Sequence, residues 1–143
     1  MIALLLGSAL AAPSWQAGAQ YNLIGGHTGL EASALWGEGA NRLRLGLALT
    51  SNIESIYAPA TLGWQGSLLQ EHRAGPLLGA GLQAQYFWST NMKPVVRPAL
   101  TVDLGVALRT ERGSLGIAVS PDLALLTEPG PGLAVRVFFS PEL

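Results

Sequence analysis

Chemistry would need reactive side chains held close together, and the sequence offers few of them. The chain has two histidines, His27 in a glycine-rich stretch and His72 between Glu71 and Arg73, and no cysteine. A metal site that both histidines shared would need both rings at one place. If the segments between them are strands that alternate in direction, the two histidines lie at opposite ends of the molecule, and no shared metal site is predicted.

Catalysis would need a base, a nucleophile and an orienting group in one constellation. His27 is followed by Thr28 and Glu31, the one combination of a ring nitrogen, a hydroxyl and a carboxylate in the chain that we consider a candidate. Closeness in sequence is not the geometry of a triad, so we interpret both histidines as surface turn residues. We predict no catalytic residue, no cofactor and no metal site.

Two further patterns have the residue types of binding motifs. Arg42 and Arg44 alternate along one segment, and either they bind an anionic headgroup at a rim or they form ion pairs inside the protein. The glycines around Gly25 and in the Gly-Glu-Gly piece at 37–39 are not phosphate loops, because no helix N-terminus follows either of them.

The composition of the chain restricts the classes of protein to which it can belong. Of its 143 residues, 49% are hydrophobic and 12% are charged, and the net charge is −1. A soluble domain carries about 25% charged residues, so this chain lacks the material for a well-solvated surface. The charge gives no reason to expect nucleic acid as a partner. No apolar run reaches the length of a transmembrane helix.

The elements that must position these residues are strands, because hydrophobic residues recur every second position rather than at a helical period. The alternation is cleanest over 41–51 and 95–109. Pro98 lacks an N–H donor and therefore needs an edge-like or irregular place in its strand. The eight predicted strands cover 15–23, 30–36, 41–51, 56–69, 78–88, 95–109, 115–125 and 133–139. Short turn-rich pieces separate them, which predicts antiparallel hairpins in up-and-down order.

The first residues have the composition of a secretory signal. Residues 1–11 are apolar, and the Ala9-Leu10-Ala11 triplet fits the small-x-small pattern of a cleavage site. We therefore expect a signal peptide at 1–11 and one β-barrel domain at 12–143. An extra apolar strand or buried helix at the start of the chain is the alternative.

Three features indicate that the apolar face of the strands points outward to lipid. The opposite face consists of Gly, Ala, Ser and Thr with few charges, which suits the narrow lumen of an eight-stranded barrel. Most segments have the 9–11 residues that cross a bilayer when tilted. Aromatic residues fall near strand ends, as in the girdles of membrane barrels. The predicted fold is an all-β, eight-stranded antiparallel up-and-down barrel.

The two sets of residues that this orientation assigns to a site are a lumen network and an aromatic girdle. Buried charges in a lumen need partners, and the turns predict that Asp122 lies opposite Arg136, Gln85 opposite Arg97, and Ser120 near Asp103. The lumen network consists of Glu31, Arg42, Arg44, Gln85, Arg97, Asp103, Asp122 and Arg136. The girdle consists of Trp15, Trp36 and Phe139 at one rim and Tyr57, Tyr86 and Trp88 at the other, while Trp64 falls deeper.

In this pattern of strands, faces and girdles, residues 13–143 resemble the small outer-membrane barrels of the OmpA, OmpX and OmpW kind. The aromatics that end such chains are displaced inward here, to Phe138 and Phe139. The resemblance implies the outer membrane of a diderm bacterium, contact with lipids and with other envelope proteins, and a structural, anchoring or partner-binding role without catalysis. The alternatives are a narrow pore or carrier for small apolar molecules, a lipid A-modifying enzyme that uses His27, and a soluble secreted barrel that binds a lipophilic ligand.

Overall fold

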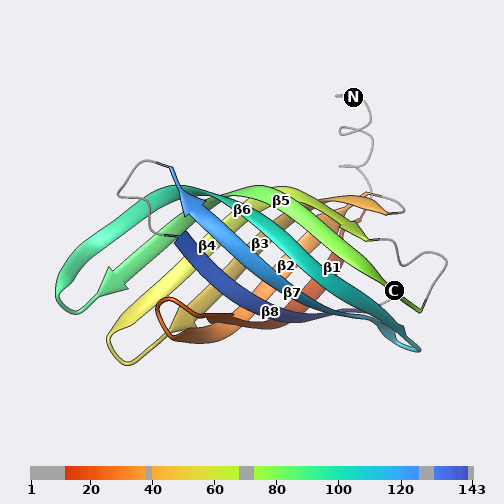
Figure 1. The fold of residues 1–143 in the computed structure, drawn as a ribbon, viewed down its shortest axis with the longest axis horizontal. Coiled ribbons are helices and arrows are strands. Elements are labelled where there is room, and N and C mark those ends of the chain that lie inside the picture. The colour runs from red at the N-terminus through yellow and green to blue at the C-terminus, as the bar shows by residue number, and fades with distance from the viewer. Residues whose placement is uncertain (1–11, 38–39, 68–72, 126–130, 142–143) are drawn as a thin grey trace.

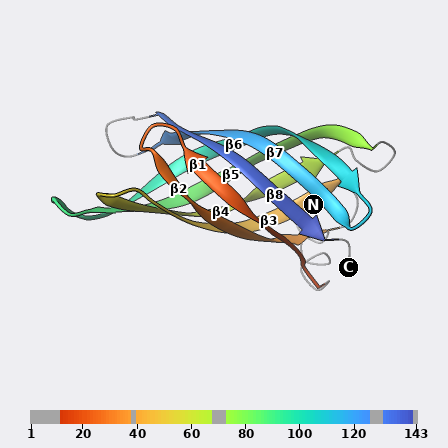
Figure 2. The same ribbon diagram turned by 90° about the horizontal axis from the view of Figure 1, so that it is seen from below.

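The chain forms a single closed barrel of antiparallel strands (Figures 1 and 2). The computed structural model describes residues 12–37, 40–67, 73–125 and 131–141; the predicted signal peptide lies outside them. Strands follow one another around the barrel in sequence order, which confirms the predicted fold class. They are β1 (Ser14–Asn22), β2 (His27–Trp36), β3 (Asn41–Ser51), β4 (Ser55–Ser67), β5 (Ala74–Ser89), β6 (Met92–Thr110), β7 (Gly113–Ala124) and β8 (Pro131–Pro141).

The alternation of side chains explains why these segments become strands and which way they face. In β3, Leu45, Leu47 and Leu49 lie on the outer surface, where Leu47 is 62% exposed, whereas Arg44 and Thr50 lie buried in the lumen. The other strands follow the same rule. An outer surface of exposed leucine and valine around a lumen of polar and small side chains is the reverse of a soluble barrel, and it is the pattern of barrels that face lipid. Within the described residues, no helix is long and apolar enough to cross a membrane.

The barrel has two different rims. The terminal rim holds the start of β1, the end of β8 and the β2–β3, β4–β5 and β6–β7 connections, and the hairpin rim holds the other four connections. β5 and β6, with 16 and 19 residues, are the longest strands, and their hairpin projects at the left of Figure 1. The closing seam between β1 and β8 has the shortest register, six residue pairs from Ala17↔Phe139 to Asn22↔Ala134.

β6 extends beyond its neighbour and leaves a free edge. Its pairing with β7 runs only to Ala99, followed by one hydrogen bond at Pro98, so residues 92–97 have no backbone partner on that side among the described residues. The carbonyl of Pro98 accepts a hydrogen bond from the Leu125 N–H at 2.9 Å. Pro98, whose carbonyl faces this edge, has no N–H donor to offer there. The predicted edge-like position of Pro98 is confirmed, and prolines there discourage pairing with another chain.

Candidate functional site

A buried cluster of four charged residues crosses the middle of the lumen. Arg136, on β8, is 3% exposed and forms a two-pronged contact with Glu31 on β2, with Nε–Oε2 at 2.6 Å and Nη2–Oε1 at 2.8 Å. Its Nη1 lies 2.9 Å from Oδ2 of Asp103 on β6. A guanidinium suits this arrangement, because its planar fork fits one carboxylate with two hydrogen bonds and still has donors for another.

Arg44 completes the cluster from the β3 side. Its Nη1 contacts Oδ2 of Asp103 at 2.7 Å, and its Nε donates to the Ser33 hydroxyl at 3.1 Å. Ser120 donates to the other oxygen of Asp103 at 2.5 Å. The two carboxylates and two guanidinium groups balance in charge: Arg136 contacts both carboxylates, and Arg44 contacts Asp103. Such mutual pairing is what makes four charges tolerable in a buried place. We call these four residues, Glu31, Arg44, Asp103 and Arg136, the central charge cluster.

A second polar group lies nearer the hairpin rim. Gln85, which is 0% exposed, accepts a hydrogen bond from Arg97 Nε at 2.9 Å and donates to the Gln83 side-chain oxygen at 2.9 Å. It also donates to the carboxylate of Asp122. The amide thus joins a cation to an anion that come from different strands, β6 and β7. These side chains form a second polar layer in the lumen, between the central charge cluster and the hairpin rim.

On the other side of the central charge cluster, towards the terminal rim, the lumen is filled with apolar side chains. Leu77, Ala107, Ala118 and Phe138 form a buried cluster, with Leu77 1% and Phe138 2% exposed. The guanidinium carbon of Arg136 lies 5.3 Å from the centroid of the Phe138 ring. A cation over an aromatic face is attracted by the ring quadrupole, so this contact ties the apolar layer to the central charge cluster.

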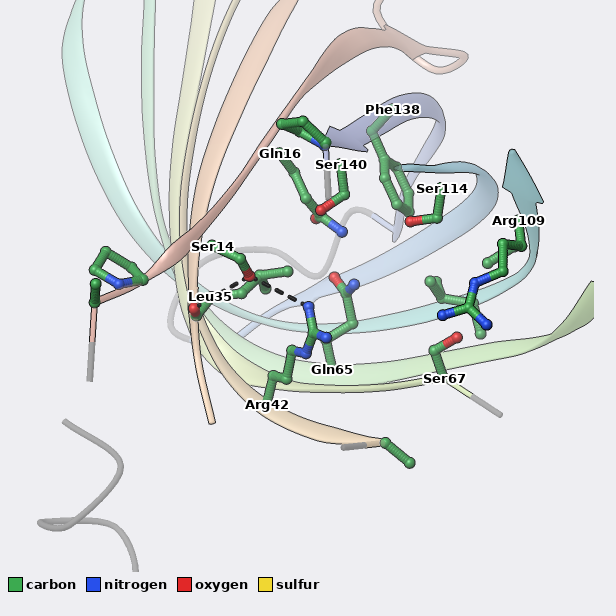
Figure 3. Close-up of a pocket in the computed structure, with 16 residues that line it drawn as sticks. Ser14, Gln16, Leu35, Arg42, Gln65, Ser67, Arg109, Ser114, Phe138 and Ser140 are labelled. Carbon is green, nitrogen blue, oxygen red and sulfur yellow. Dashed lines mark hydrogen bonds between the residues drawn. The ribbon is translucent and has the colours of Figure 1, made fainter. Parts of the chain in front are cut away.

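Cavities remain beside these layers. One, of about 20 Å³, is lined by the central charge cluster and by Asp122 of the Gln85 group, and it is roughly the room that one water needs. Another, of about 600 Å³, opens at the terminal rim (Figure 3). Its walls include Ser14, Gln16, Arg42, Gln65, Arg109 and Phe138. The lumen is therefore hollow at the terminal rim and filled in its middle.

His27 forms a separate polar group at the hairpin rim. Its ring is buried, with Nε2 2.7 Å from the Ser55 hydroxyl on β4, and it lies 6.0 Å from the ring centroids of both Tyr57 and Phe87. The Ser55 hydroxyl in turn donates to the side-chain oxygen of Asn52 at 2.9 Å. His27 is the first residue of β2 and points inward, so the prediction that it is a surface turn residue is wrong. His72 lies outside the described residues.

Comparisons with solved structures agree on the architecture. Neisserial surface protein A matches with a TM-score of 0.68 over 92% of this chain and 96% of its own, at 11% sequence identity. A chain from a study of de novo designed transmembrane β-barrels matches at 0.55, with 13% identity over 90% and 94%. The attachment invasion locus protein Ail of Yersinia pestis, solved with the heparin analogue sucrose octasulfate, matches at 0.52, with 14% identity over 90% and 96%.

The chain has the fold of the small eight-stranded outer-membrane β-barrels. The predicted resemblance to this class is confirmed at the level of architecture. No protein-family model and no curated protein matches the sequence. At identities of 11–14%, the likeness concerns the path of the backbone and not the side chains of a site.

The predicted lumen residues of this barrel meet in two separate groups, with one exception. Glu31, Arg44, Asp103 and Arg136 meet in the central charge cluster, and Gln85, Arg97 and Asp122 meet in the second polar group. Arg42 lies apart from both, in the wall of the larger cavity, where it donates to Ser14 at 3.2 Å.

Two of the three predicted neighbours are found and one is wrong. Gln85 pairs with Arg97, and Ser120 contacts Asp103. Asp122, however, lies opposite Gly132 and not opposite Arg136, whose own partner on β7 is Ala118. The register is shifted by an even number of residues, so both side chains keep the predicted face while their partners change. The contact between Arg136 and Glu31 joins strands far apart in the sequence, and no turn signal could have predicted it.

The predicted aromatic girdle divides between the two faces. Trp15, Tyr86, Trp88 and Phe139 lie on the outer surface, with exposures from 37% to 54%, and Trp36 is half-buried at the end of β2. Tyr57 is only 5% exposed and lies against His27 inside the barrel, so its place in the girdle is corrected. Its position shares parity with Pro59 and Thr61, which face inward, and not with Leu62 and Trp64, which face outward.

The candidate combination of His27, Thr28 and Glu31 is not brought together by the fold. No group of three or more potential metal ligands occurs within the described ranges. Thr28 is exposed on the outer surface, on the face opposite to His27, and Glu31 is engaged by Arg136. His27 and Glu31 are four positions apart on one strand, a distance of roughly 13 Å. The three residues therefore do not form one constellation.

Proposed function

We propose that this chain is a non-catalytic β-barrel of the outer membrane of a diderm bacterium, with a structural, anchoring or partner-binding role. The observation that carries the proposal is the combination of an apolar outer surface with a lumen whose middle is filled by paired charges. Lipid would cover the exposed leucines and valines, whose removal from water is favourable. The partners expected are membrane lipids and other proteins of the envelope.

The filled lumen argues against a role as a pore or carrier. A diffusing molecule would have to pass the apolar layer, the central charge cluster and the Gln85 group. The cavity beside the central charge cluster has a volume of only about 20 Å³. Opening that path would separate Arg136 from two carboxylates at 2.6–2.9 Å. Breaking a buried pair of this kind costs about 3–5 kcal/mol, so a conducting state would be populated rarely.

The geometry around His27 supports a role without catalysis. In a serine nucleophile, the histidine must accept the hydroxyl proton. Here the Ser55 hydroxyl donates to Asn52, whose side-chain oxygen also accepts from the backbone N–H groups of Glu54 and Ser55. The histidine Nε2 then acts as the donor to Ser55, which holds two hairpins together at the rim. A lipid A-modifying activity would need the opposite direction of this hydrogen bond.

The location can be tested by fractionation and gel mobility. The chain should sediment with the outer membranes. On a gel in detergent, the closed barrel should migrate differently before and after boiling. A chain recovered in the soluble fraction with no change of mobility would overturn the location and the lipid-facing surface together.

The role can be tested separately on the purified barrel. In planar bilayers, we expect no steady conductance from the unmodified chain, and channel activity from it would overturn the filled-lumen argument. In cells that express the chain or its His27→Ala variant, the mass profile of lipid A should be the same. A modification that appears with the unmodified chain and disappears with the variant would make the protein an enzyme.

A further inference from the structure

The larger cavity differs from the rest of the lumen in that one of its cations, Arg42, has no carboxylate partner among the described residues. It opens at the terminal rim, with Arg42 in one wall (Figure 3). In the central charge cluster, by contrast, each guanidinium contacts a carboxylate. A cation in a concave surface with low-dielectric walls attracts ions of the opposite sign.

Arg42 is the cation best placed to receive such an ion. Its half-buried guanidinium makes one hydrogen bond, from Nη1 to the Ser14 hydroxyl at 3.2 Å, and no carboxylate lies within ion-pair distance among the residues that the structure describes. A guanidinium has five donors, so most of those on Arg42 remain for a ligand. Carboxylates and phosphates are the groups that its fork matches.

The cavity also has acceptors that lack a donor. The side-chain oxygens of Gln16 and Gln65 are buried and have no hydrogen-bond partner in the described part of the chain, although each residue is only 5% exposed. Figure 3 shows both side chains extending into the space beside Arg42. Buried polar atoms are normally hydrogen-bonded, and a rotation of either amide would direct it towards a bound N–H group.

The inner end of the cavity is apolar. Leu77 and Phe138 line it and belong to the buried cluster that covers the central charge cluster. A ligand that enters from the terminal rim would therefore meet a guanidinium and hydroxyls first, amides next, and an apolar surface at the inner end. At about 600 Å³, the cavity has the size of a small-molecule site.

We propose that this cavity binds the carboxyl-terminal end of a peptide whose last side chain is apolar. The carboxylate pairs with Arg42, the backbone N–H groups donate to Gln16 and Gln65, and the terminal side chain rests on Leu77 and Phe138. A fatty acid would satisfy the cation and the apolar surface, and a phosphate the cation alone. Only a peptide or an acylated amino acid supplies all three kinds of group.

The test uses the whole barrel, labelled with ¹⁵N and inserted in lipid nanodiscs. N-acetyl-Leu-Leu with a free carboxylate is titrated while the side-chain amide signals of Gln16 and Gln65 are followed by NMR, with empty nanodiscs correcting for partition into lipid. The same dipeptide with an amidated end and octanoate serve as comparison probes. We expect the free acid to shift both amide signals and to bind at least about 10-fold more tightly than the amidated form, because a charge-assisted hydrogen bond is lost.

Variants then locate the carboxylate. Arg42→Gln should reduce the affinity for the free acid about 10-fold, whereas Arg112→Gln, which removes an exposed arginine from the β6–β7 turn of the same rim, should leave the affinity unchanged. Equal binding of the acid and amidated forms to the unmodified chain would overturn the proposal without any variant. Octanoate binding as tightly as the dipeptide would overturn the assignment to a peptide, and no shift of either amide signal would overturn the site.

Discussion

The sharpest test of the lumen concerns Arg136 and its partner Glu31. Arg136→Met removes one cation and leaves Glu31, which is 6% exposed, without an ion pair. Asp103 keeps Arg44 at 2.7 Å. Removing one partner of a buried pair costs about 3–5 kcal/mol, which is a large fraction of the stability of an ordinary domain.

The double variant decides whether this cost arises from an unpaired charge. In Glu31→Leu/Arg136→Met, the lumen loses one negative and one positive charge together, and the remaining Arg44 and Asp103 still balance. Replacing a buried pair by apolar residues of similar size is often neutral or stabilising. We therefore expect the double variant to be at least 2 kcal/mol more stable than Arg136→Met alone, on the same order-of-magnitude scale.

The assay is reversible urea unfolding of the barrel in lipid vesicles, followed by tryptophan fluorescence and by the heat-dependent change in gel mobility. Arg112→Met, at an exposed turn position, is the control and should change the free energy of unfolding by no more than about 0.5 kcal/mol. If Arg136→Met costs less than about 1 kcal/mol, or if the double variant is the least stable of the set, the central charge cluster is not held by mutual pairing.

Three further substitutions, the first with a matched control, test the outer surface, the hydrogen bonding of the cluster and the free edge. Leu47→Arg, on the lipid-facing middle of β3, should cost about 2–4 kcal/mol in urea unfolding, whereas Ile53→Arg, at a fully exposed turn, should cost about 0–1 kcal/mol; equal costs would contradict burial of β3 in lipid. Ser120→Ala removes the 2.5 Å hydrogen bond to Asp103 and should cost about 1.5–3 kcal/mol by the same measurement, and no change would mean that this contact is absent in the membrane. Pro94→Val restores an N–H donor in the segment of β6 that extends beyond β7 and should increase the cross-linked dimer fraction, and an unchanged fraction would show that this segment is protected by other means.

Local patterns in the sequence were sufficient to predict the architecture and one class of contact. Alternation defined the strands because a period of two leaves little ambiguity in segments such as 41–51. The contacts Gln85–Arg97 and Ser120–Asp103 could be predicted because each joins neighbouring strands whose separating turn is short, with described residues 90–91 and 111–112 between the strands.

The wrong predictions have physical causes as well. The predicted contact of Asp122 with Arg136 depended on counting residues through the connection between β7 and β8, and the observed register differs from that count. The place of Tyr57 in the girdle was predicted from its position near the end of a strand. Its place in the alternation of β4 instead puts its side chain inside the barrel. His27 and Ser55 are 28 positions apart in sequence. Nothing in the sequence around Ser55 marks its hydroxyl as a hydrogen-bond partner of His27.

The short seam between β1 and β8 has a consequence for how the barrel is assembled. Every other pair of neighbouring strands is a hairpin that can form from adjacent sequence, but β1 and β8 must meet across nearly the whole chain, through six residue pairs. Before contacts between such distant segments can form and stabilise the barrel, the conformational entropy of a long loop must be lost. We therefore expect a curved sheet with two open edges to be the last intermediate before closure. The bidentate contact of Arg136 with Glu31 joins β8 to β2, and we expect it to slow the reopening of the closed barrel.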